Sequence, residues 1–242
     1  DFAGNWRGLL KSLCLSPYAL LAYLRLFAQI KKNPGQQIVV YSGFSEKILP
    51  GWLAKFYQLP IYFIEYGPLE PIFQKLAAMP SYLYLLSKNS AKKVIVPSKH
   101  TFQALTKYFP KTKLVYLPCG VKAAKISQRN KFKAQQLCVV SRLEKGKWQD
   151  LLIKAFLLIK KVFPQVSLHI IGQGQFLKDL RSLAKNDPQI KFLAFVKHKE
   201  KLLLESELII CPSVWPLEGF GLTIVEAMAL AKPIVAFDRP PG

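Results

Sequence analysis

The sequence has few acidic side chains. Only 14 Asp and Glu stand against 35 Lys and Arg among 242 residues, so the formal net charge is +21. An excess of this size predicts an anionic partner, which a nucleic acid, an anionic membrane surface or an anionic substrate would provide. Hydrophobic residues make up 51% of the chain, which excludes a disordered protein because there is ample apolar material for a core. The length fits one large domain or two small ones.

Cysteine and long hydrophobic runs are also scarce. The four cysteines form no CxxC pair, so the sequence indicates neither a zinc site nor a disulfide framework, and a reducing cytosol fits best. The most apolar stretch, residues 9–30, is interrupted by Lys11, Pro17 and Arg25, whereas a spanning helix needs about 20 mostly apolar residues. We therefore predict a cytoplasmic protein without a membrane span. The chain begins at Asp1 and stops soon after an apparent strand, so we expect both native ends to be missing.

Short β-branched runs alternate with helical patterns along the chain, which predicts an α/β fold with parallel sheets. The expected strands are 38–42, 61–65, 94–97, 114–117, 136–141, 166–171, 190–193, 208–211 and 233–237. The expected helices include 46–57, 101–108, 148–162, 175–184 and 222–230. A polar, basic linker over 121–136 divides the chain into predicted domains 1–128 and 129–242.

Ligands of open parallel sheets bind beyond the carboxyl ends of the strands, so residues that follow strands are the candidates for a site. Arg142 and Lys147 follow one expected strand and precede a helix, where two cations and the helix N-terminus would bind an anion. A solvated basic turn is the alternative interpretation. Gly172 and Gly174 follow the next strand, but Leu177 stands where a dinucleotide fingerprint needs a third glycine. These glycines permit either close approach to a ligand or a tight turn.

The most specific segment follows the strand at 208–211. Glu218 and Glu226 lie on either side of a Gly219-Phe220-Gly221 turn that opens a helix. The glycines let backbone N–H groups face a phosphate, and the carboxylates suit sugar hydroxyls as hydrogen-bond acceptors. Glu226 lies within an otherwise apolar run, where a carboxylate is costly unless it has a partner. A helix cap with a surface Glu is the less favoured interpretation.

Together these residues resemble the retaining glycosyltransferases of family 4, also called glycosyl transferases group 1. The resemblance covers 136–242 well, and 94–98 and 117–122 carry a looser match in the first half. Its elements in the second half are Arg142, Leu143, Lys147 and Asp150, then Gly172 and Gly174, then Glu218 through Glu226, and finally 232–236.

The resemblance implies the GT-B fold, in which two Rossmann-like domains with parallel sheets face across a cleft, both incomplete here. It implies transfer of a sugar from a nucleotide-diphosphate sugar to an acceptor hydroxyl with retention of configuration. Arg142 and Lys147 would bind the diphosphate and Glu218 the transferred sugar, which makes these three the predicted catalytic residues. No cofactor or metal is implied, and the sequence has no Asp-x-Asp motif. The predicted substrate-binding residues are Gly172, Gly174, Phe195, Val196, Gly219, Phe220, Gly221, Leu222, Thr223 and Glu226.

The sequence departs from the family pattern at two places. Trp148 replaces the usual Gly after the motif Lys. The segment Ile64-Glu65-Tyr66-Gly67 lacks the His that the family often has near the reacting sugar. Either Glu65 or Tyr66 takes over that environment, or the role is absent.

Two other interpretations remain open. A basic nucleic-acid-binding module is disfavoured because the aromatic residues lie mostly in apolar runs rather than between Lys and Arg. Another GT-B-like enzyme, such as a sugar epimerase or a phosphorylase, would share the motifs.

The acceptor is expected to be a glycan or a lipid-linked glycan. Residues 1–128 carry 17 basic and 4 acidic side chains, which would suit peripheral contact with an anionic membrane.

Overall fold

The computed structural model describes residues 6–33, 35–41, 45–75, 78–121, 135–194, 196, 199–214 and 218–238, with the backbone alone for 6–16, 45, 75 and 78–80. The chain divides into two compact units, Asp1–Leu117 (unit 1) and Pro118–Gly242 (unit 2). This division comes somewhat before the boundary predicted at 128/129. Most of the expected linker lies outside the described residues.

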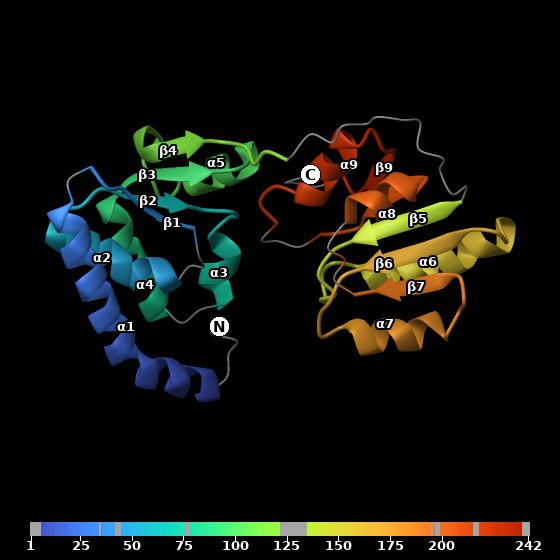
Figure 1. Ribbon diagram of the computed structural model, residues 1–242, viewed down its shortest axis with the longest axis horizontal. Helices are drawn as coiled ribbons and strands as arrows, with labels where there is room; N and C mark the ends of the chain where they lie inside the picture. Colours follow the sequence, from blue (N-terminus) through green and yellow to red (C-terminus); the bar gives the residue numbers. More distant parts are fainter. Residues whose placement is uncertain are drawn as a thin grey trace. The chain divides into compact units, whose positions relative to one another are not determined.

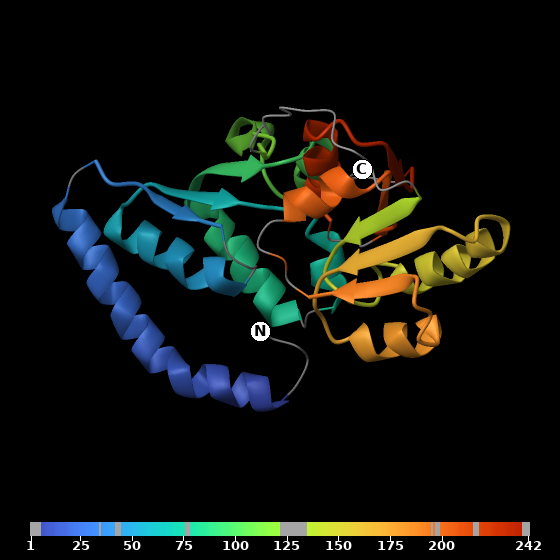
Figure 2. The ribbon, with the colours of Figure 1, turned by 45° about the vertical axis from the view of Figure 1, so that its right-hand side comes forward.

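Unit 1 is built around a parallel sheet of four strands in the order β1-β2-β3-β4. Helices α1, α2 and α4 lie together beside this sheet (Figures 1 and 2). The strands are β1 (Ile38–Val40), β2 (Ile61–Ile64), β3 (Ala91–Val96) and β4 (Leu114–Tyr116). The helices are α1 (Trp6–Lys32), α2 (Ile48–Tyr57), α3 (Glu70–Lys75), α4 (Ala78–Ser87) and α5 (Lys99–Leu105), with short 3₁₀ turns η1 (Ser45–Lys47), η2 (Lys88–Ser90) and η3 (Lys111–Lys113).

Two features of unit 1 differ from the sequence-based expectation. Helix α1 runs for 27 residues with Pro17 inside it, whereas the sequence analysis assigned no helix to this stretch and concluded only that it does not span a membrane. Strand β3 begins at Ala91 rather than Val94, because the strand alternates faces and can place the exposed Lys92 outward while Ala91 is buried. No described helix is long and apolar enough to cross a membrane.

A buried polar cluster lies just beyond the carboxyl end of β2. Glu65 is 5% exposed, and its Oε2 lies 2.9 Å from the Nζ of Lys47, which also donates to the backbone oxygen of Ile64 at 2.7 Å. The hydroxyl of the fully buried Tyr84 donates to the other oxygen of Glu65. Burial, and then the charge of Glu65, raise the pKa of Tyr84. Glu65 therefore holds η1 and α4 against β2, while the neighbouring Tyr66 is 47% exposed.

Unit 2 is built around a parallel sheet of five strands in the order β7-β6-β5-β8-β9. Helices α6 and α7 lie on one face of this sheet and α8 and α9 on the other (Figures 1 and 2), as expected for right-handed crossovers. The strands are β5 (Gln136–Val140), β6 (Ser167–Ile171), β7 (Ile190–Leu193), β8 (Leu208–Cys211) and β9 (Ile234–Ala236). The helices are α6 (Gln149–Val162), α7 (Leu177–Ala184), α8 (Lys199–Glu205) and α9 (Leu222–Ala229).

The strand order of unit 2 reverses direction between β5 and β8. Chain connections run from β5 outward to β7, then return across the sheet to β8. The loop after β5 therefore leads toward β6, and the loop after β8 leads the opposite way toward β9. Open parallel sheets bind ligands between two such loops, at the carboxyl ends of the strands. The sequence-based strands of unit 2 are confirmed to within a residue or two at their ends.

Candidate active site

A pocket of about 350 Å³ lies at the carboxyl ends of β5 and β8. Its lining includes six of the predicted site residues: Arg142, Lys147, Glu218, Gly221, Leu222 and Thr223. A larger groove of about 740 Å³ lies between α6 and the strands β8 and β9, but hydrophobic side chains such as Leu152, Ile159 and Val235 dominate it. Of these two pockets, the smaller one combines Arg142, Lys147 and Glu218 with the N-terminus of α9, so we assign the site there.

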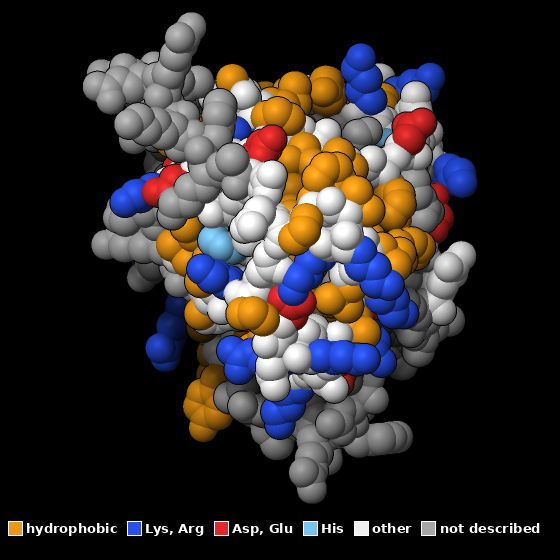
Figure 3. Space-filling view, turned by 90° about the vertical axis from the view of Figure 1, so that its right-hand side faces the viewer, with side chains coloured by type: hydrophobic (Ala, Val, Ile, Leu, Met, Phe, Trp, Pro, Cys, Tyr) orange, Lys and Arg blue, Asp and Glu red, His pale blue; other side chains and the backbone are white. Residues whose placement is uncertain are grey.

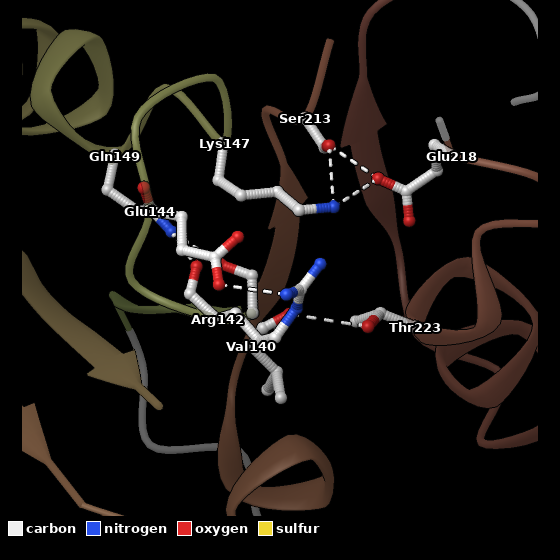
Figure 4. Close-up of polar contacts among 9 residues, drawn as sticks. Val140, Arg142, Glu144, Lys147, Gln149, Ser213, Glu218 and Thr223 are labelled. Carbon is white, nitrogen blue, oxygen red and sulfur yellow. Dashed lines mark hydrogen bonds and ion pairs between the residues drawn. The ribbon is translucent and has the colours of Figure 1, made fainter. Parts of the chain in front are cut away.

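The loop after β5 positions Lys147. Gln149, the first residue of α6, is fully buried, and its Nε2 donates to Ser141 Oγ and to the backbone oxygen of Arg142, both at 2.7 Å. The backbone N–H of Lys147 donates to Glu144 O at 3.1 Å. These bonds fold the loop back on itself, so the Lys147 side chain points into the pocket (Figure 4).

Lys147 and Glu218 form an ion pair within the pocket. The Nζ of Lys147 lies 2.5 Å from Glu218 Oε2, and the two side chains are 9% and 27% exposed. Ser213, which follows β8, joins both groups: its Oγ accepts from Lys147 Nζ at 3.1 Å and donates to Glu218 Oε2 at 2.5 Å. Figure 4 shows the three side chains converging. The cation and the carboxylate are therefore in direct contact with each other. The sequence analysis expected them to contact adjacent parts of one ligand.

Arg142 lies at the open side of the same pocket. Its guanidinium donates to Glu144 Oε1 at 2.8 Å, and the side chain is 65% exposed. An exposed pair of this kind contributes little to stability, because solvent screens it and two flexible side chains must be ordered. Arg142 can therefore exchange Glu144 for an anionic ligand at small cost.

The N-terminus of α9 closes another side of the pocket. Gly221 caps the helix with φ of +67°, a left-handed conformation that favours glycine. The hydroxyl of Thr223 donates to the backbone oxygen of Val140 at 3.3 Å, which ties the first turn of α9 to the end of β5. The N–H groups of such a first turn, with the helix dipole, favour a bound anion.

Gly172 and Gly174 pack against the Arg142 loop. A Cβ at Gly172 would lie 1.9 Å from the backbone oxygen of Ser141, and one at Gly174 would lie 2.1 Å from that of Leu143. The backbone N–H of Leu143 also donates to Gln173 O at 2.9 Å. The glycines permit two loops to approach closely, which shapes the loop that carries Arg142. Neither glycine lines the pocket among the described residues.

Glu226 has the partner that its apolar sequence context required. Lys199, the first residue of α8, donates to both carboxylate oxygens at 2.7 and 2.8 Å. Among the described residues, Glu226 does not line the pocket.

The remaining predicted substrate-binding residues are placed as follows. Val196 packs against a hydrophobic cluster around Cys138 and Ile171, and Gly219 is buried. Phe220, which follows Gly219, is half-buried and is not part of the pocket lining that the structure describes. Phe195 lies outside the described residues.

The sequence analysis did not identify Ser213, Gln149 or Lys199. Ser213 had a usable signal, since it is the first residue with a polar side chain after β8. Cys211 also lines the pocket, but burial and then the charge of Glu218 raise the pKa of its thiol to about 11. Cys211 is therefore a neutral thiol at pH 7 and a poor nucleophile.

Trp148, which replaces the usual glycine of the family pattern, has a left-handed conformation and a ring contact of its own. It caps α6 with φ of +53°, a left-handed conformation that costs a residue with a Cβ about 1–2 kcal/mol. Its ring packs edge-on against Phe237 at 5.5 Å between centroids. A glycine would adopt this conformation without strain but would lose the ring contact.

We expect Trp148→Gly to be more stable than Trp148→Ala by about 1 kcal/mol, because both lose the ring and only alanine keeps the strain. Urea unfolding of the two variants measures this difference. Equal stability, or a more stable alanine variant, would show that the left-handed conformation is not maintained.

The half of the chain that contains this pocket is similar to a known protein family. The family model described as "Glycosyl transferases group 1" matches residues 122–242. The chain belongs to this family. The match contains the whole pocket, with Arg142, Lys147, Glu218 and the α9 N-terminus.

Curated relatives and solved structures agree with the family. The GtfA subunit of a UDP-N-acetylglucosamine–peptide N-acetylglucosaminyltransferase from Streptococcus pneumoniae is 30% identical over 141 residues, covering 58% of this chain and 28% of the relative. The alpha-monoglucosyldiacylglycerol synthase of the same species is 24% identical over 222 residues, covering 81% and 50%. The structure of Anabaena HepE with UDP and glucose is similar with a TM-score of 0.71, at 21% identity, over 88% of this chain and 62% of that one.

The structural likeness confirms the predicted GT-B type of fold, with Rossmann-like units and parallel sheets. The chain spans about a quarter to a half of the length of these two curated relatives.

Proposed function

We propose that this protein transfers a sugar from a nucleotide-diphosphate sugar to an acceptor hydroxyl in glycan or glycolipid biosynthesis, as a retaining enzyme of glycosyltransferase family 4. The observation that carries the proposal is the contact of Lys147 with Glu218 at the N-terminus of α9. A cation, a helix N-terminus and a carboxylate within one pocket match the diphosphate and the hydroxyl groups of such a donor.

Lys147 and Arg142 would stabilise the leaving diphosphate. Negative charge grows on the leaving phosphate as the glycosidic bond breaks, so fixed cations stabilise the transition state more than the bound donor. Lys147 is buried and held by Ser213 and Glu218, which keeps its position defined before the donor arrives. The N–H groups of Gly221, Leu222 and Thr223 would contribute to the same phosphate.

Glu218 would accept hydrogen bonds from the transferred sugar. Its Oε2 is shared with Lys147 and Ser213, so the carboxylate is oriented by two fixed donors. A donor whose phosphate binds Lys147 would place its sugar next to this carboxylate. The contact between the two side chains thus matches the covalent link between phosphate and sugar in the donor.

Glu226 would bind the ribose hydroxyls of the donor, with its carboxylate held by Lys199. The described residues contain no group of three or more His, Cys, Asp and Glu that could hold a metal ion, and metal independence stays a prediction. A cytoplasmic location and contact with an anionic membrane also stay predictions. The acceptor would be a glycan or a lipid-linked glycan.

Product analysis by NMR, after incubation with nucleotide sugars and candidate acceptors, tests the proposal. We expect a new glycosidic bond with the anomeric configuration of the donor. A change in the identity of the sugar without transfer would indicate an epimerase, and a sugar phosphate formed from inorganic phosphate would indicate a phosphorylase. Either of these products, or an inverted linkage, would contradict the proposed retaining transfer.

A further inference from the structure

Positive charge in this chain is concentrated in one acid-free segment. Residues 71–143 contain fourteen Lys and Arg and no Asp or Glu. The described part of this segment includes β3, α5, η3 and β4 of unit 1, and β4 is an edge strand of the sheet. Like charges at close range destabilise a fold by mutual repulsion, unless counter-charges reduce it. The segment supplies no carboxylate of its own.

Three lysines of this segment converge where β3 and β4 begin. Lys93 donates to Thr112 O at 2.8 Å, and Lys113 donates to Asn89 O at 2.9 Å. Lys88 donates to the backbone oxygen of Tyr108. Burial, and then the charge of Lys113, lower the pKa of Lys88. Backbone oxygens thus hold three ammonium groups in place, and two of them, those of Lys88 and Lys113, repel each other.

A groove of about 440 Å³ lies between α5, η3 and β4, and its lining residue Lys111 is two positions before Lys113. Lys99 and Lys111 line it together with the aromatic rings of Phe102 and Tyr116. Lys99 follows the carboxyl end of β3, and Lys111 precedes β4, so the groove runs lengthwise beside the edge of the sheet. We call the set of Lys88, Lys93, Lys99, Lys111, Lys113, Phe102 and Tyr116 the basic edge.

Two features of the basic edge indicate a chain-like ligand rather than a flat surface. The lysines lie along the edge from one end of the strands to the other, and several are fixed by backbone contacts. The aromatic rings line a hollow between lysines, where they can contact the apolar faces of sugar or polyol units.

We infer that the basic edge binds an extended anionic acceptor, a chain of sugar or polyol units that carries regularly spaced phosphate groups. The inference rests on the proposed glycosyl transfer and names the class of acceptor. The lysines pair with the phosphates, and Phe102 and Tyr116 contact the units between them. The whole chain carries a net charge of +21, and Figure 3 shows more Lys and Arg than Asp and Glu side chains on a face of unit 2 as well. This general excess assists the approach of such a chain over a longer range.

Sedimentation binding in 0.15 M salt tests the inference, with poly(glycerol phosphate) as the probe. We expect Lys99→Gln/Lys111→Gln to weaken binding on the order of tenfold, because two charges beside the groove are lost. Lys154→Gln/Lys178→Gln removes the same charge from exposed positions of unit 2 and should change binding less than twofold. Phe102→Leu/Tyr116→Leu should weaken binding while the net charge stays the same.

Equal binding by the Lys99/Lys111 and Lys154/Lys178 variants would overturn the inference, since the attraction would then be nonspecific. Tighter binding to vesicles with phosphatidylglycerol, or to a single-stranded oligonucleotide, would overturn it in favour of a membrane or a nucleic acid. Titration with a nucleoside diphosphate separates this outcome from failure of the proposed function. The basic-edge variants should bind the diphosphate normally, and failure of wild-type protein to bind it would count against the donor site alone.

Discussion

Replacement of Lys147 by Ala should reduce glycosyl transfer about 10²–10³-fold, the usual effect of removing one positioned group that stabilises developing charge. The variant loses the buried ammonium that contacts Glu218 and Ser213. The loss should appear mainly in kcat, because the charge on the leaving phosphate is greatest in the transition state. Steady-state kinetics with the nucleotide sugar in the full-length enzyme measure the effect.

Lys145→Ala is the matched control, because Lys145 lies in the same loop and is exposed. It removes the same charge from the loop and should leave kcat within about twofold of wild type. Glu218→Gln keeps the size of the side chain, removes its charge and should also reduce transfer by orders of magnitude. Near-normal turnover in both Lys147→Ala and Glu218→Gln would refute the assignment of the site.

Substitution of Gly172 by Ala should destabilise the protein by more than about 2 kcal/mol, because a backbone atom blocks the added methyl group. The new Cβ would lie 1.9 Å from the backbone oxygen of Ser141, and φ of +152° adds strain for any residue with a Cβ. The obstacle cannot rotate away as a side chain could. Relief requires movement of the loop that carries Arg142 and Lys147, so the diphosphate site should be disturbed as well. Urea unfolding and binding of a nucleoside diphosphate measure the two effects.

Gly120→Ala is the control for this change. A Cβ at Gly120 would meet nothing within 4 Å, so its free energy of unfolding should stay within about 0.5 kcal/mol of wild type. Similar stability of Gly172→Ala and Gly120→Ala would show that the two loops of unit 2 are not packed as described.

Much of unit 2 could be predicted because its sequence signals are local. Short runs of β-branched residues that alternate with helical patterns predicted the parallel sheet. Because ligands bind beyond the carboxyl ends of parallel strands, the loops after β5 and β8 were candidates for the site. The costly carboxylate of Glu226 correctly required a partner. The identity of that partner, Lys199, depends on a contact between two helices that are separated in sequence, and no local pattern specifies it.

Other features depend on tertiary contacts in the same way. The contact between Lys147 and Glu218 joins loops after two strands, so their neighbourhood was predictable and their direct pairing was not. Helix α1 was missed because Pro17 and two cations interrupt its apolar pattern, although packing of Phe27 into the core of unit 1 stabilises its second half. The left-handed conformation of Trp148 is visible only in the structure, because tryptophan gives no sequence signal for it.

The most direct test of the central claim is a calorimetric titration with nucleoside diphosphates and, separately, with the matching nucleosides. If Lys147, Arg142 and the N-terminus of α9 form a diphosphate site, one diphosphate should bind at least tenfold more tightly than its nucleoside. That advantage should largely disappear in Lys147→Ala and persist in Lys145→Ala. Equal affinity for diphosphate and nucleoside in the wild-type protein, across the common bases, would contradict the account.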